Sequence, residues 1–184
     1  VLPTISDDLK KGALQATLWS LVLIAIYIFV RFRKWQYSLG TLVALFHDVL
    51  IVLSFFTLLS GVIPVALEID QHFIAAILTV MGYTMTESVV VFDRIREYLG
   101  HHHTADDKHV INEALNATLS RTINTTLTVF FVLIVIFIFG GEVIRGFIFV
   151  LLIGRIIGTY SSLCISTPIV IDLGGNAHEG VAKK

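Results

Sequence analysis

Four ionisable side chains interrupt long apolar stretches of the sequence: Asp48, Glu87, Arg121 and Arg155. Inside a lipid bilayer such a group is costly unless it is paired, hydrated or neutralised, so each one is a candidate for a functional role. The alternative is that the four charges only form ion pairs that hold helices together. Two acids and two bases give a neutral interior, which suits both interpretations.

Counting at 1.5 Å per residue along helices suggests how these charges pair by depth. Glu87 lies near the end of its apolar stretch and Arg121 near the start of the next, which predicts one ion pair. Asp48 and Arg155 both lie near the middle of theirs, which predicts a second. Burial raises the pKa of a carboxyl group and a nearby guanidinium lowers it, so a moving arginine could load and unload a proton. We therefore hypothesise that at least one acid titrates during function.

Polar side chains accompany these charges along the same helices. They either line a hydrated ion path or serve ordinary packing between helices, and the sequence leaves both possibilities open. They lie next to a charge or within about one helical turn of it: His47, Thr84, Thr86, Ser88, Asn124 and Thr125.

Small residues recur at every fourth position in the last apolar stretch, at Gly154, Gly158 and Ser162. Such a stripe predicts close approach of another helix, from this chain or from another subunit. Pro168 follows and is expected to kink or end the helix, because proline lacks a backbone N–H group.

The composition indicates how these residues must be positioned. The 184 residues are 55% hydrophobic and only 15% charged, with a mean hydropathy of +0.84, whereas soluble domains carry about 25% charged residues. The apolar runs are about 20 residues long, enough to cross a hydrocarbon core of about 30 Å. We predict an all-α transmembrane bundle over residues 12–172, with an external segment at 1–11 and a cytoplasmic tail at 173–184. The five spans are expected at about 12–30, 39–60, 73–92, 119–139 and 147–171, with a short amphipathic helix and a loop between the third and fourth.

Basic residues near the span ends predict the orientation. One side of the membrane receives nine: Arg31, Arg33, Lys34, Arg94, Arg96, Lys108, Arg121, Lys183 and Lys184. The other side receives three: Lys10, Lys11 and Arg145. The first side should therefore be cytoplasmic, with the N-terminus outside and the C-terminus inside. An outward N-terminus without a signal peptide suggests that a further segment precedes this one in a longer polypeptide.

Several classes of function are not supported by the sequence. The net charge of −1 does not favour nucleic acid as a partner, and Cys164 is the only cysteine. The run His101, His102 and His103, with His109 nearby, lacks the pattern of a metal shell and is interpreted as a solvated stretch. We find no phosphate-binding loop and no nucleophile arrangement, so we expect no enzyme activity, no metal and no cofactor other than a coupling proton.

Longer motifs in this sequence resemble the SecF family. GYTMTESVVVFDRIRE, residues 82–97, is similar to the family segment GYSxNDTVVVFDRIRE and includes the polar motif Asp93, Arg94 and Arg96, expected in a cytoplasmic loop. Further similar segments are HDVLIVL at 47–53, LSRTINTTLTV at 119–129, IFGGEVIRGF at 138–147 and IGTYSS at 157–162. They follow the family's order over nearly the whole chain.

The resemblance implies a protein of six transmembrane helices with an external domain between the first two, of which this chain would supply helices two to six. It implies pairing with SecD and association with the SecY channel and the YidC insertase in the bacterial inner membrane. The proton gradient would then assist late export of preproteins. The family's intramembrane acid and arginine fall on Glu87 and Arg121.

The chain also departs from the family pattern. The family acid is normally Asp and follows Asn, where this chain has Glu87 after Thr86. Arg155 stands where the family has an apolar residue, so its expected pairing with Asp48 comes from depth alone. Two alternatives remain open at this stage: half of a proton-coupled small-molecule or lipid exporter of the same resistance–nodulation–division superfamily, and a passive scaffold between channel and insertase.

Overall fold

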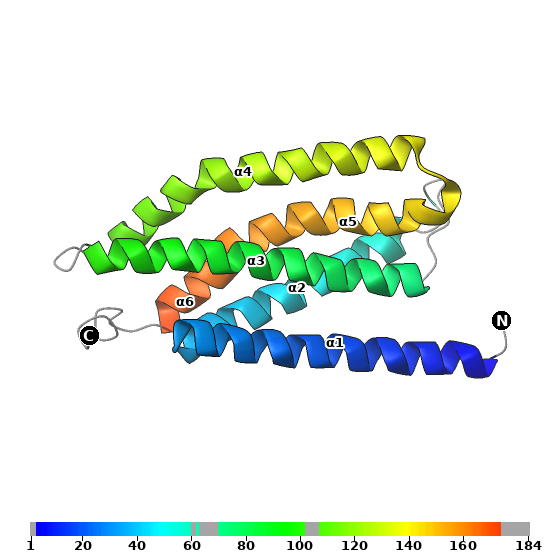
Figure 1. Cartoon of the computed structure of the whole chain (residues 1–184), viewed down its shortest axis with the longest axis horizontal. Coiled ribbons are helices and arrows are strands. Elements are labelled where there is room, and N and C mark those ends of the chain that lie inside the picture. The colour runs from blue at the N-terminus through cyan, green and yellow to red at the C-terminus, as the bar shows by residue number, and fades with distance from the viewer. Residues whose placement is uncertain (1–2, 60–61, 63–69, 102–106, 174–184) are drawn as a thin grey trace.

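The computed structural model describes residues 3–59, 62, 70–101 and 107–173 as a bundle of long antiparallel helices (Figure 1). All the regular structure in these ranges is helical. The helices are α1 (Pro3–Phe32), α2 (Trp35–Leu59), α3 (Gln71–His101), α4 (Asp107–Phe139), α5 (Glu142–Ser161), a π-helical turn (Ser162–Ser166) and α6 (Thr167–Leu173).

Five segments are long and apolar enough to cross a membrane, which confirms the expected number of spans and makes this a multi-pass membrane protein. They are Lys11–Phe32, Trp35–Leu59, Gln71–His101, Lys108–Phe139 and Glu142–Leu173. The last combines α5, the π turn and α6. The helices alternate in direction, so the α1–α2 turn, the end of α3, the start of α4 and the end of α6 lie at one end of the bundle (Figure 1). The predicted tail was 173–184: Leu173 ends α6, and residues 174–184 lie outside the described residues.

The polar stretch between the third and fourth spans does not form a separate amphipathic helix, so that prediction was wrong. It extends α3 to His101 and begins α4 at Asp107. The extensions are held together because each has an apolar side: Ile95 and Leu99 of α3 are buried in one cluster with Val110 of α4. A helix whose apolar stripe is covered by a neighbour continues past the membrane span.

The most deeply packed helices are α3 and α5, which contact each other along the bundle. Their interface contains Val80 and Met81 of α3 and Val150 and Leu151 of α5. Large apolar side chains of α1 and α4 remain exposed, including Trp19 and Phe131. In a membrane such faces meet lipid tails or other transmembrane helices.

The tight connection between α1 and α2 depends on a left-handed residue. Arg33 has φ 56°, and its backbone N–H donates to the Phe29 carbonyl at 2.7 Å. A residue in this conformation ends a helix by satisfying one of its last carbonyl groups, and the residue at such a position is usually glycine. Phe32, Tyr37 and Phe92 then pack around the turn, with ring centroids 4.9 to 5.6 Å apart.

The π turn explains how the last span accommodates Pro168, and the helix continues past this proline as α6. Proline cannot donate to the carbonyl one turn earlier and its ring crowds that group, so the hydrogen-bond register shifts before it. The hydroxyls of Ser166 and Thr167 both donate to the Ser162 carbonyl, at 2.7 and 3.2 Å. Gly40 of α2 lies against this segment, where a Cβ atom would be 2.8 Å from the Ser166 carbonyl oxygen.

Candidate functional site

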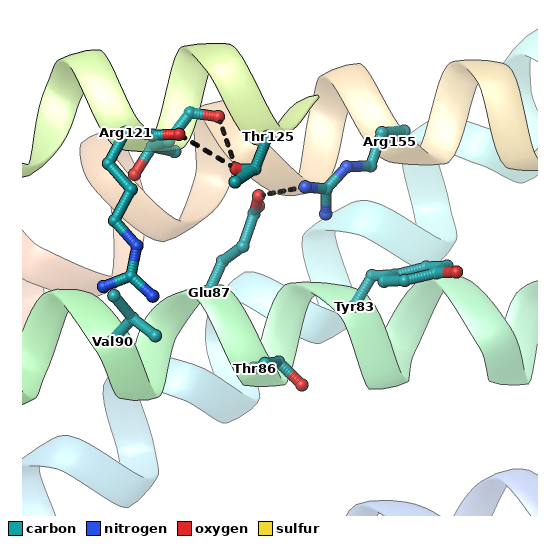
Figure 2. Close-up of a pocket in the computed structure, with 8 residues that line it drawn as sticks. Tyr83, Thr86, Glu87, Val90, Arg121, Thr125 and Arg155 are labelled. Atoms are coloured by element: carbon teal, nitrogen blue, oxygen red, sulfur yellow. Dashed lines mark hydrogen bonds and ion pairs between the residues drawn. The ribbon is translucent and has the colours of Figure 1, made fainter. Parts of the chain in front are cut away.

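The central feature of the site is an ion pair between α3 and α5. Arg155 Nη2 lies 2.7 Å from Glu87 Oε1, and the two side chains are only 7% and 11% exposed. Figure 2 shows the two side chains meeting between the helices. The expected partners were therefore wrong: Glu87 pairs with Arg155 and not with Arg121.

Hydroxyl groups complete the surroundings of the Glu87 carboxylate. The Thr159 hydroxyl is 3.0 Å from Oε2 and the Thr126 hydroxyl is 3.4 Å from Oε1, while the two hydroxyls are 2.8 Å from each other. Thr159 also donates toward the Arg155 carbonyl at 3.0 Å. Hydrogen bonds to the ionised form and a paired guanidinium both stabilise a carboxylate removed from water.

A second arginine lines the same cavity, on the opposite side of Glu87 from Arg155 (Figure 2). Arg121 extends from α4 toward α3 and, with Glu87 and Arg155, lines a cavity of about 180 Å³ (Figure 2). Among the described residues no acid forms an ion pair with Arg121. With every group ionised, this cavity carries one acid and two bases, so its local charge is +1.

Asp48 occupies a separate site, and its expected pairing with Arg155 was wrong because that arginine is taken by Glu87. The Asp48 side chain is 0% exposed. The Thr84 hydroxyl donates to Asp48 Oδ2 at 2.9 Å, and His47 Nδ1 lies 3.3 Å from Oδ1. The nearby Ser161 hydroxyl donates to the Gly158 carbonyl of its own helix at 3.1 Å.

The small residues of α5 determine how closely these sites approach. A Cβ atom at Gly154 would overlap Val80, and one at Gly158 would overlap the Thr84 hydroxyl, both on α3. The partner of the glycine stripe is therefore a helix of this chain. The third member, Ser162, is fully buried in the π turn.

The remaining polar candidates divide between the site and the helix surface. Thr86 and Thr125 line the cavity, although their hydroxyls donate to carbonyls of their own helices. Asn124 is exposed on α4, and Ser88 is fully buried with no hydrogen-bond partner among the described residues.

Five residues of the site were not predicted. Val90 and Thr122 line the cavity, the Tyr83 ring lies under the Arg155 guanidinium at 5.3 Å, and Thr126 and Thr159 surround the Glu87 carboxylate. Helical spacing could have identified two of them, because Tyr83 precedes Glu87 by four residues and Thr159 follows Arg155 by four.

The motif Asp93, Arg94 and Arg96 lies on α3 and not in a loop. Asp93 pairs with Arg31 of α1 at 2.7 Å, and Arg94 pairs with Glu97 at 2.7 Å within the helix. Arg96 lies over the Phe32 ring at 5.5 Å. The motif therefore joins the ends of α1 and α3 at the membrane boundary.

The histidine run offers no metal centre in the part of the chain that the structure describes, where no three His, Cys, Asp or Glu side chains gather. His101 ends α3 and His109 lies 3.9 Å from Glu113 on α4. His102 and His103 lie outside the described residues.

Known protein export subunits resemble this chain over nearly its whole length. Residues 1–176 match the family model described as "Protein export membrane protein SecD/SecF, C-terminal". The chain is 52% identical over 175 residues to the protein translocase subunit SecF of Rhodothermus marinus and 43% identical over 177 residues to that of Thermodesulfovibrio yellowstonii. These alignments cover 95% of this chain and 56% of each relative, so the chain spans about half the length of the relatives it matches.

A solved structure agrees with these relatives. The crystal structure of SecDF from Thermus thermophilus, described as a translocon-associated membrane protein, matches with a TM-score of 0.85 and 35% sequence identity. The match covers 94% of this chain and 23% of that one. The chain therefore belongs to the SecD/SecF C-terminal family of protein export membrane proteins.

Proposed function

We propose that this chain is the membrane part of a SecF subunit which, together with SecD, uses the proton gradient to assist late translocation of preproteins through the SecY channel. Its membership of the SecD/SecF family and its similarity to SecF translocase subunits support this function over that of a small-molecule or lipid exporter. The proposal includes a bacterial inner-membrane location, an outer N-terminus, a cytoplasmic C-terminus and, as a further partner, the YidC insertase.

The observation that carries the proposal is the buried Glu87–Arg155 pair beside Arg121. When Glu87 is ionised, its carboxylate is held by Arg155 and shares a cavity with a second guanidinium group, that of Arg121. When a proton binds a carboxylate oxygen, the carboxyl group becomes neutral and no longer offsets the two guanidinium charges. The local charge rises from +1 to +2.

That change in charge supplies a force between helices. Arg121 and Arg155 stand on α4 and α5, and like charges in a medium of low dielectric constant repel strongly. Binding a proton therefore favours separation of the two arginines, and releasing it favours their return. A charge-dependent movement of this kind would couple proton passage to the position of α4 against α5.

The experiment measures preprotein translocation into inverted inner-membrane vesicles that contain the full-length protein and its SecD partner. Glu87→Gln should abolish the part of the translocation that depends on the proton gradient, because the neutral amide carries no exchangeable charge. The exposed Glu113→Gln on α4 is the matched control and should behave like the wild type. Translocation that still responds fully to the gradient in Glu87→Gln would reject coupling through this acid.

A double variant tests the scaffold alternative. A passive scaffold predicts that Glu87→Gln with Arg121→Gln leaves translocation intact, whereas coupling predicts that the gradient-dependent part is lost. Isolation of the full-length protein in mild detergent, with identification of the co-purifying chains, tests the proposed SecD, channel and insertase partners.

A further inference from the structure

We propose that His47 and Asp48 form a second proton-binding site inside the bundle, separate from the Glu87 site. One proton is held between the Asp48 carboxyl group and the His47 imidazole. The inference goes beyond the proposed function, since this site could bind a proton whether or not Glu87 drives export.

Burial makes a lone charge at Asp48 unfavourable. Its side chain is 0% exposed, and in the described part of the chain neither arginine nor lysine forms an ion pair with it. A carboxylate removed from water needs a compensating cation or must be neutralised by a proton. The titratable group available at short range is His47, with Nδ1 3.3 Å from Oδ1.

Groups on the helices packed against α2 do not replace that partner. From α5, Arg155 is paired with Glu87 of α3, and Tyr160 lies near the His47 ring with centroids 6.5 Å apart. From α1, α6 and the π turn, no described acid or base forms an ion pair with either member of the dyad. The dyad therefore shares no ion pair with the Glu87 site in the described part of the chain.

The surroundings hold the carboxyl group in place without supplying charge. The Thr84 hydroxyl donates to Oδ2 at 2.9 Å. Gly158 leaves room for this contact, because a Cβ atom there would overlap the Thr84 hydroxyl and lie 3.6 Å from Oδ2. The site is thus built from α2, α3 and α5 around a single carboxyl group.

The proton has two positions within the dyad, and the net charge is the same in both. When it moves from imidazolium Nδ1 to carboxylate Oδ1, an N–H bond breaks, an O–H bond forms, and the net charge of the dyad stays at zero. His47 is 31% exposed and is the member of the dyad that reaches the surface of the bundle. Neither His47 nor Asp48 lines the Glu87 cavity.

Infrared spectroscopy of the full-length protein with its SecD partner in lipid tests the site, because a protonated carboxyl group has a C=O band distinct from carboxylate bands. Asp48→Asn, which retains an acceptor for Thr84, should remove one such band, while Glu87→Gln and the exposed Asp172→Asn should keep it. An unchanged spectrum in Asp48→Asn, or loss of that same band in Glu87→Gln, would overturn the proposal.

A second variant keeps the test decisive if Asp48→Asn does not fold. His47→Gln retains the carboxyl group but cannot take up a proton, so the band should persist and no longer change across the range where histidine titrates. A band with wild-type position and pH response in His47→Gln would count against the dyad. Translocation by Glu87→Gln is measured separately, so failure of this site and failure of the proposed export mechanism give different results.

Discussion

Arg155 and Glu87 form a buried ion pair at 2.7 Å that links α5 to α3, the two most deeply packed helices of the bundle. Removing one partner leaves a charge without compensation in an apolar environment. Replacing both partners with uncharged residues of similar volume leaves no uncompensated charge. The ion pair therefore predicts that single and double substitutions differ in how much they lower the free energy of unfolding.

Arg155→Met and Glu87→Gln should each lower the free energy of unfolding of the full-length protein, the first by about 3 kcal/mol or more, because it leaves the carboxylate unpaired. The double variant should lose less than the sum of the two single changes. The measurement is a double-mutant cycle of unfolding in lipid nanodiscs. Additive losses would show that the two side chains do not interact in the membrane.

Gly158→Ala should destabilise the α3–α5 interface by about 1–3 kcal/mol, because its Cβ would overlap the Thr84 hydroxyl. Gly82→Ala on α3 is the control, since nothing lies within 4 Å of a Cβ there. Thr84→Ala should restore most of the stability of Gly158→Ala by removing the hydroxyl. The measurement is thermal unfolding of Gly158→Ala, Gly82→Ala, Thr84→Ala and the double variant Gly158→Ala with Thr84→Ala. Equal losses of stability in Gly158→Ala and Gly82→Ala would contradict the close approach of α5 to α3.

Arg33→Gly should stabilise the α1–α2 turn by about 1 kcal/mol, because glycine adopts the left-handed conformation at φ 56° without strain. Arg33→Asn should lie between arginine and glycine, and Arg33→Val should be worse than the parent. The readout is the unfolding midpoint of each variant, and a midpoint that is highest for valine would refute a left-handed residue here.

Asp93→Asn should change the free energy of unfolding by less than about 1 kcal/mol, because its ion pair with Arg31 is half-exposed. Any large loss of preprotein translocation in this variant would then reflect a role of the motif in function and not in folding. Translocation and unfolding are measured on the same preparations. A large loss of stability would show that the pair is essential for the fold.

The orientation is tested with single cysteines in a Cys164→Ser background. His101→Cys, at the end of α3, should react with a membrane-impermeant maleimide only in inverted vesicles. Val143→Cys, exposed near the start of α5, should react in spheroplasts. The reverse pattern would invert the proposed topology.

The spans could be predicted from the sequence because runs of apolar residues are a property of the chain itself. Their ends could not: α3 and α4 continue past the membrane because Leu99 and Val110 cover each other, and this contact joins residues from two helices. The polar stretch was predicted to contain a short amphipathic helix, but the sequence did not indicate that its helical parts continue α3 and α4.

The charged residues were found from the sequence, whereas their pairing was not. Depth gives a position along each helix axis but not the direction in which a side chain points around it. Gly154 and Gly158 bring α5 against α3, and this rotation directs Arg155 to Glu87. Asp48 consequently faces Thr84 and His47, a partnership that depth alone could not reveal.

The π turn makes the two helices of the candidate site differ in continuity. α3 carries Glu87 on an unbroken α-helix from Gln71 to His101, while the span bearing Arg155 changes its hydrogen-bond register at Ser162–Ser166. Bends in helices concentrate where that register changes, so a bend in the last span is expected beyond Arg155, whereas α3 has no such point on either side of Glu87.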